Sequence, residues 1–282
     1  MSPHSGDALG LAAALSFASP SPRFRFSHFV MQLHFTETGQ GRAVVLLHGL
    51  FGSSDNWYTV AQQLAESFQV FALDQRNHGQ SPHSEEMNYP MMAADVDRFF
   101  TARGLERAVV IGHSMGGKTA MQLALHYPQR VEKLVVADMA PRAYTASHDK
   151  IFDALLALDL PRFQTRPQIE TALEPDIPNP VLRRFLLKNL GRDQAGAFFW
   201  KINLRDLALN YWRLREPVAG DAPYAGPTLF IRGGNSKYVQ PEDEPLIHEW
   251  FPAARVETIE AAGHWVHADR PEEFLRVVLG FL

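Results

Sequence analysis

The sequence predicts an α/β protein with a mostly parallel central sheet, helices on both faces of that sheet and an inserted helical segment. Three observations support this fold class. Short β-branched, apolar runs alternate with stretches of helical spacing, an order typical of parallel β-α units. Polar residues and glycines directly follow several of the runs, where a parallel sheet forms its ligand site. Between residues 142 and 226 the alternation lapses for far longer than the usual connection of about 4 to 6 residues, which indicates an insertion.

The first half of the core contains four predicted strands and three predicted helices. The strands are short, apolar and rich in Val, Ile and Leu, as expected for strands buried on both faces. The helix that follows the third predicted strand stops at Pro128, because a proline disfavours helical backbone in the residue before it. In chain order, we expect strand 44–47, helix 57–68, strand 69–73, helix 91–103, strand 108–112, helix 115–127 and strand 134–137.

The sheet resumes after the insertion with strands 228–232 and 255–259. A closing helix is expected over 271–282, with Pro271 in its first turn, where proline is tolerated. We therefore expect a core made of residues 29–141 and 227–282 with a helical cap, residues 142–226, between its two parts.

The cap is predicted to contain helices 150–158, 166–173, 181–190 and 196–209, separated by prolines. Its aromatic residues are frequent, and some of them are expected to roof an apolar pocket. The alternative for each is that it packs in the cap's own core. The candidates for the pocket, together with one aromatic residue near the C-terminus, are Phe152, Phe163, Phe185, Phe199, Trp200 and Trp265.

Composition excludes several classes of protein. The 282 residues are 46% hydrophobic and 21% charged, and the formal net charge is −4. The chain therefore lacks the excess of basic residues that is typical of nucleic-acid-binding proteins. No apolar run reaches the roughly 18 residues of a membrane span. The chain has no cysteine, which rules out disulfides and cysteine nucleophiles. We expect no nucleic-acid partner, no membrane partner, no metal and no cofactor; the oligomeric state is left open.

Residues 1–28 differ in character from the rest and are expected to be a disordered extension or an over-extended start. Residues 8–18 are apolar enough to suggest a signal peptide. A secretory signal, however, requires a positive charge before its apolar segment, and no such charge precedes these residues. The expected location is the cytoplasm, and a targeting role for this segment stays open.

The most informative motif is Gly112-His113-Ser114-Met115-Gly116, which follows a predicted strand and opens a predicted helix. This is the Gly-x-Ser-x-Gly nucleophile elbow of serine hydrolases. The sharp turn places the serine in strained backbone angles, and a side chain at either glycine would collide with the turn. Ser114 is therefore the expected nucleophile.

A serine hydroxyl needs a base to take its proton and a third group to orient that base. His264, directly after the last predicted strand and C-terminal to Ser114, is the expected base. His48 and His113 are expected to brace their own loops, and His267 to make a local hydrogen bond near Asp269.

The oxyanion of the tetrahedral intermediate requires backbone N–H donors. One is expected from Met115, at the start of the helix, where the helix dipole assists. The second is expected from Leu50 or Phe51, in a loop whose glycines let the backbone approach a substrate closely.

Five segments together resemble the α/β-hydrolase superfamily, and most of all its small YbfF-type esterases and their mitochondrial relatives. The resemblance runs from about residue 31 to the C-terminus and is weak in the cap. It implies a carboxylesterase or thioesterase with a catalytic triad and no cofactor. The segments are His48-Gly49-Leu50-Phe51-Gly52-Ser53-Ser54-Asp55-Asn56-Trp57, Asp74-Gln75-Arg76-Asn77-His78-Gly79-Gln80-Ser81, Gly112-His113-Ser114-Met115-Gly116-Gly117-Lys118, Gly233-Gly234-Asn235-Ser236 and Gly263-His264-Trp265-Val266-His267-Ala268.

The triad acid is where the sequence departs from the superfamily's usual pattern. That pattern has an Asp in the loop after strand 228–232, but this loop contains Asn235 and Ser236. In YbfF-type enzymes the acid is instead similar to Asp138, which is therefore the expected acid. Asp243 is expected to be solvated at the start of a helix, and Asp74 to hold its own turn through Arg76.

The residues thus predict a serine esterase that cleaves esters of short to medium acyl chains through an acyl-enzyme. A thioesterase, a lyase or a cofactor-free haloperoxidase remains an alternative on the same fold, whereas a dehalogenase or epoxide hydrolase would need Asp in place of Ser114. Outside enzymes, the alternative is a ligand sensor that has lost turnover.

Overall fold

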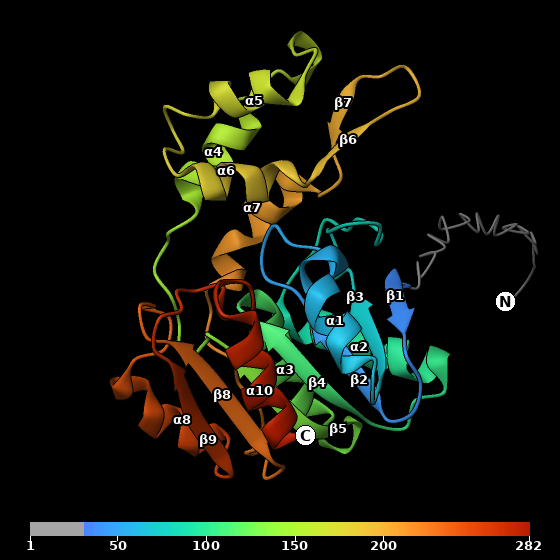
Figure 1. Cartoon of the computed structure of the whole chain (residues 1–282), viewed down its shortest axis with the longest axis vertical. Helices are drawn as coiled ribbons and strands as arrows, with labels where there is room; N and C mark the ends of the chain where they lie inside the picture. The colour runs from blue at the N-terminus through green and yellow to red at the C-terminus, as the bar shows by residue number, and fades with distance from the viewer. Residues whose placement is uncertain (1–30) are drawn as a thin grey trace, which may run out of the picture. The chain divides into compact units, whose positions relative to one another are not determined.

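A central sheet of seven strands organises the part of the chain that the structure describes, residues 31–282 of a computed structural model (Figure 1). The predicted N-terminal extension lies outside the described residues. Six of the strands are parallel to their neighbours and only the edge strand β1 runs antiparallel. In spatial order the strands are β1 (Phe35–Thr38), β3 (Gln69–Leu73), β2 (Ala43–Leu47), β4 (Ala108–His113), β5 (Val131–Ala137), β8 (Thr228–Gly233) and β9 (Ala254–Ile259).

The predicted fold class is confirmed, and the one strand of the central sheet that the sequence did not predict is β1. Its residues, Phe-Thr-Glu-Thr, are partly or fully exposed, as is usual at a sheet edge. Such a short, polar segment carries no apolar run by which a strand could be recognised. In contrast, every residue of β2 and β4 is buried.

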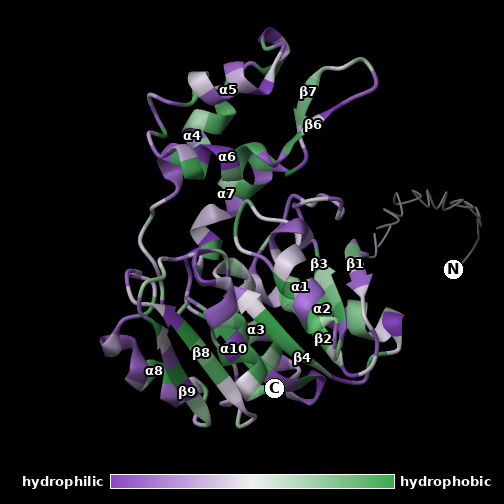
Figure 2. Cartoon of the chain, viewed as in Figure 1, coloured by the Kyte–Doolittle hydropathy of each residue, from purple (hydrophilic) through white to green (hydrophobic). Residues whose placement is uncertain are grey.

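Helices cover both faces of the sheet because successive strand residues point to opposite sides. Val45 and Leu47 pack with the helices of one face, whereas Val44 and Leu46 pack with those of the other. Figure 2 shows the strands as apolar segments inside a more polar exterior. The first face holds α2 (Tyr89–Arg103), α3 (Met115–His126) and α8 (Glu244–Trp250); the second holds α1 (Tyr58–Leu64), α9 (Val266–Asp269) and α10 (Pro271–Phe281).

The segment between β5 and β8 folds as a cap next to the carboxyl ends of the strands (Figure 1). Its apolar core is continuous with Phe51 and Met115, which lie in the turns after β2 and β4. The cap therefore lies over the end of the sheet where the elbow is found. Its elements are α4 (Asp149–Leu156), α5 (Arg166–Ala172), α6 (Pro180–Leu187), β6 (Leu190–Arg192), β7 (Phe198–Trp200) and α7 (Leu204–Leu214).

The helix predicted over residues 196–209 is wrong at its N-terminal end. Phe198–Trp200 forms strand β7, which pairs with β6, and the helix begins only at Leu204. Aromatic residues favour extended backbone, and the hairpin turn is stabilised by Asp193, whose carboxylate accepts the N–H groups of Ala195 and Ala197. Gly196 takes a φ of 83° in this turn, which only glycine adopts readily.

Candidate active site

Ser114 lies in the turn between β4 and α3 with φ 53° and ψ −118°. This strained conformation persists because the surrounding backbone allows no alternative. A Cβ on Gly112 would lie 2.1 Å from the carbonyl oxygen of Gly116, and one on Gly116 would lie 2.2 Å from that of Leu47. Both glycines are thus required for the turn to pass this close to neighbouring backbone, as the motif predicts.

The fold brings Ser114, His264 and Asp138 into one hydrogen-bonded chain, although about 150 residues separate the first two. Nε2 of His264 lies 3.0 Å from Ser114 Oγ, and Nδ1 lies 2.7 Å from Asp138 Oδ2. Each residue follows the carboxyl end of a strand: β4, β9 and β5 respectively. In this arrangement the imidazole can accept the serine proton while the carboxylate orients it.

The carboxylate of Asp138 is fully buried and hydrogen-bonded at both oxygens. Oδ1 accepts the N–H of Gly233 at 3.0 Å, and Oδ2 accepts the hydroxyl of Ser236 as well as the imidazole. A buried carboxylate is stable only when such donors replace water. Ser236 lies in the loop where the superfamily's usual acid would be, and its hydroxyl contacts Asp138, which directly follows β5.

His264 is held in place by Tyr238, which sequence reasoning did not identify, and by His113, which was expected to brace its own loop and instead contacts the loop of His264. The ring of Tyr238 stacks on the imidazole with 3.7 Å between centroids and 17° between planes. On the other side, Nε2 of His113 donates to the backbone carbonyl of His264 at 2.9 Å. The location of Tyr238, two residues after Ser236 in the loop after β8, was the only signal that could have suggested it.

The amides of Met115 and Leu50 are suited to hold an oxyanion. In the part of the chain that the structure describes, neither N–H has a hydrogen-bond acceptor, and both residues line the space in front of Ser114. The prediction of Phe51 as the alternative donor is wrong, because its N–H already donates to His78 Nε2 at 3.3 Å. Phe51 also adopts a φ of 61°, which is uncommon for a residue with a side chain.

Two cavities meet at Ser114. The larger, about 440 Å³, is lined by Phe185 and Trp265 among others, and the smaller has about 40 Å³. The other four predicted pocket aromatics line neither cavity, so that part of the prediction is wrong. Phe152, Phe163 and Trp200 pack in the cap core, and Phe199 is exposed on the hairpin.

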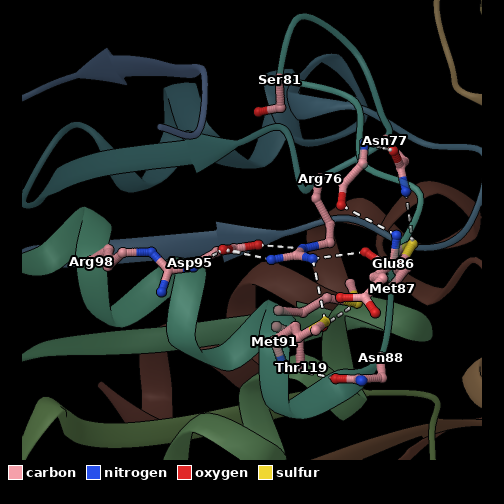
Figure 3. Close-up of polar contacts among 12 residues, drawn as sticks. Arg76, Asn77, Ser81, Glu86, Met87, Asn88, Met91, Asp95, Arg98 and Thr119 are labelled. Carbon is pink, nitrogen blue, oxygen red and sulfur yellow. Dashed lines mark hydrogen bonds and ion pairs between the residues drawn. The ribbon is translucent and has the colours of Figure 1, made fainter. Parts of the chain in front are cut away.

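The turn after β3 is braced differently from the expected Asp74–Arg76 contact. Asp74 accepts the backbone N–H groups of Ser54 at 2.7 Å and Gln80 at 2.9 Å. The guanidinium of Arg76 instead forms two hydrogen bonds with Asp95, of 2.6 and 2.9 Å, and Figure 3 shows it directed toward that carboxylate on α2. The expected contact is therefore wrong, although Asp74 does hold its own turn.

Asp243 is buried rather than solvated, which corrects the expectation from the sequence. Its carboxylate accepts from Arg142 Nε at 2.8 Å and from the N–H of Gln240 at 2.9 Å. Both oxygens are thus used in the loop that leads into α8, and the side chain makes no contact with His264.

Several buried histidines surround the triad. His48 Nε2 accepts the N–H of Gln75 at 3.0 Å and its Nδ1 lies 2.8 Å from the carbonyl of Gly49, so it braces its loop as expected. The local hydrogen bond expected for His267 is wrong: its ring stacks on Trp57 with 4.5 Å between centroids, and Nδ1 has no partner among the described residues. Burial lowers the pKa of His78 to about 3 and that of His267 to about 3.

These two histidines predict a loss of stability in acid. Both stay neutral in the folded protein between about pH 3 and their unfolded pKa of about 6.5, where the unfolded chain binds more protons. Their contribution is therefore complete above pH 6.5 and is lost as the pH falls; at pH 5 the two together cost about 4 kcal/mol. Urea denaturation at pH 5 and pH 8 measures this difference.

The matched variant His267→Phe keeps an aromatic ring against Trp57 and removes one of the two titrating groups. It should reduce the difference between the two pH values by about 2 kcal/mol, the share of one histidine. His48, His113 and His148, whose pKa burial also lowers, contribute equally in both proteins. Equal unfolding free energies of the wild-type protein at pH 5 and pH 8 would contradict the prediction.

Neither a metal site nor a membrane span is evident in the described part. Residues 31–282 contain no group of three or more histidine, aspartate or glutamate side chains arranged to hold a metal ion. Within the same residues, no helix has the length and apolar character needed to cross a membrane.

Comparison with known proteins identifies clear relatives. Residues 42–173 match a family model described as alpha/beta hydrolase fold. The sn-1-specific diacylglycerol lipase ABHD11 of Mus musculus is 42% identical over 85% of this chain and 80% of its own length. Esterase YbfF of Escherichia coli K12 is 37% identical over 85% of this chain and 92% of its own. A solved structure titled "Marine microorganism esterase" shares 44% identity with a TM-score of 0.87, covering 89% of this chain and all of that one.

Proposed function

Because the chain belongs to the α/β-hydrolase family and is a carboxylesterase-type hydrolase, we propose that Ser114, His264 and Asp138 form its catalytic triad. The observation that carries this proposal is the hydrogen-bonded chain of 3.0 and 2.7 Å from serine through imidazole to carboxylate. Relatives named as an esterase and a lipase support an ester as the substrate.

The reaction proceeds in two halves. His264 Nε2 takes the proton of Ser114 as Oγ attacks the ester carbonyl, and the amides of Met115 and Leu50 stabilise the oxyanion. Collapse of this intermediate breaks the bond to the alcohol oxygen, which leaves with the proton from His264. A water molecule then attacks the acyl-enzyme with His264 again as base, and release of the acid restores the serine.

The proposed substrates are esters of short to medium acyl chains, and the proposed location is the cytoplasm. Residues 29–141 and 227–282 form the catalytic core in this proposal, and residues 142–226 form the cap. The cap contributes Phe185 to the larger cavity, while Trp265 comes from the core loop after β9.

A fluorophosphonate probe tests the proposed nucleophile directly, since it reacts only with an activated serine. We expect one label per chain, on Ser114, as located by peptide mass spectrometry. The Ser114→Ala variant is the control and should take up no label. A folded wild-type protein without any label would indicate a ligand sensor and overturn the proposal.

A further inference from the structure

Ser114 borders two cavities that differ about tenfold in volume and are lined by different residues of the proposed site. The larger cavity, about 440 Å³, is lined by His264 but not by Met115. The smaller cavity, about 40 Å³, is lined by Met115 but not by His264. Leu50 borders both. A bound ester must therefore place its two halves in spaces of very different size.

The chemistry decides which half enters which cavity. His264 must deliver its proton to the alcohol oxygen as the tetrahedral intermediate collapses, so the alcohol must lie on the side of His264. The carbonyl oxygen faces the amides of Met115 and Leu50, and the remaining substituent of the carbonyl carbon is the acyl chain. We infer that the acyl chain occupies the smaller cavity and the alcohol the larger one, an inference that rests on the proposed function.

The smaller cavity has room for only a few atoms. Its volume is about 40 Å³, against about 440 Å³ for the larger cavity, so it can hold only a much shorter chain. We therefore expect the smaller cavity to favour short acyl chains over long ones. The larger cavity admits an alcohol several times that size.

The walls of the smaller cavity suit an alkyl chain. Leu214 and Met139 are buried there, and the hydroxyls of two of its tyrosines are already hydrogen-bonded to backbone carbonyls. The hydroxyl of Tyr89 donates to the carbonyl of Leu214 at 2.7 Å, and that of Tyr144 to the carbonyl of Tyr238 at 2.6 Å. The guanidinium of Arg215, also at this cavity, lies 5.4 Å from the centre of the Tyr211 ring.

The larger cavity is lined on the cap side by one face of α6. Val181, Leu182 and Phe185 come from this helix, and Trp265 lies opposite, with 5.7 Å between its ring centroid and that of Phe185. None of these four residues borders the smaller cavity. The acyl and alcohol preferences are thus set by separate groups of side chains, which can be altered independently.

Two isomeric esters test the assignment without any change in composition. Hexyl acetate carries a short acyl group on a long alcohol, and ethyl hexanoate has the reverse arrangement. We expect kcat/KM for hexyl acetate to exceed that for ethyl hexanoate by about tenfold or more, since a pocket commonly discriminates by that factor for each methylene that does not fit. Equal values, or a preference for ethyl hexanoate, would overturn the assignment.

Variants of the two cavities provide the matched test. Leu214→Ala enlarges only the smaller cavity, and it should raise the ratio of ethyl hexanoate to hexyl acetate turnover by about tenfold. Phe185→Ala enlarges only the larger cavity and should leave that ratio unchanged or lower it. An unchanged ratio in a Leu214→Ala variant that is folded, as judged by circular dichroism, would contradict the inference. If Leu214→Ala does not fold, Met139→Ala tests the same wall.

The same protein preparation should be assayed with p-nitrophenyl acetate and the fluorophosphonate probe. Turnover and labelling combined with a preference for ethyl hexanoate would overturn only the cavity assignment. Absence of both turnover and labelling would overturn the proposed function and the assignment together.

Discussion

Replacement of Ser114 by alanine is expected to lower kcat for ester hydrolysis by about 10⁶. The substitution removes a single oxygen, the one that lies 3.0 Å from His264 Nε2. It retains the Cβ, so the backbone turn at φ 53° experiences no new steric conflict. The remaining groups can still bind an ester and polarise its carbonyl, but no acyl-enzyme can form.

The measurement is kcat with p-nitrophenyl acetate, accompanied by the thermal unfolding midpoint. We expect the midpoint of the Ser114→Ala variant to stay within a few degrees of wild type. Among residues 31–282, the Ser114 hydroxyl makes no hydrogen bond other than that to His264. A folded variant that retains wild-type activity would show that another group carries out the attack.

Replacement of Asp138 by asparagine is expected to lower kcat by about 10⁴, the scale of a triad acid made neutral. In the wild-type protein the Gly233 N–H donates to Asp138 Oδ1. The amide oxygen of the asparagine would keep this hydrogen bond. The NH₂ group would then face His264 Nδ1. That contact forces Nδ1 to accept, so the ring proton moves to Nε2, and the imidazole can no longer take the proton of Ser114.

Asp243→Asn is the matched control, because Asp243 is also a buried aspartate at the same end of the sheet. Its carboxylate binds Arg142 and the N–H of Gln240 rather than a histidine. The variant is expected to lose stability through the weakened ion pair, while kcat stays within about tenfold of wild type. If the Asp243→Asn variant is folded but inactive while Asp138→Asn is active, the assignment of Asp138 is overturned. Asp243, in the segment after β8, would then be the acid.

The sequence could predict the features that depend on local spacing. The Gly-x-Ser-x-Gly turn, the buried runs of β2 and β4 and the position of His264 after the last strand are each determined by a few adjacent residues. In an α/β sheet, residues at the carboxyl ends of parallel strands meet at one edge. The strand order therefore implies that Ser114 and His264 converge, although the sequence contains no direct sign of their 3.0 Å contact.

Other features depend on contacts between segments far apart in the chain, and only the tertiary structure decided them. The amide of Phe51 binds His78, a residue of the loop after β3 that only the fold brings beside it. Likewise Ser236 and Tyr238 reach the triad only because β8 lies between β5 and β9.

The cap shows the same division most clearly. Its composition indicated that aromatic residues of the cap line the pocket above Ser114, but the sequence did not show which of them do so. Of the five proposed from the cap, only Phe185 lines a cavity at Ser114. Phe198–Trp200 became a strand, since pairing with Leu190–Arg192 stabilises an extended backbone that helical periodicity alone could not exclude. Which apolar side chain faces a cavity and which one packs in the core is determined by the neighbours that the whole fold supplies. The proposed catalytic residues Ser114 and His264, in contrast, are specified by the short segments that contain them.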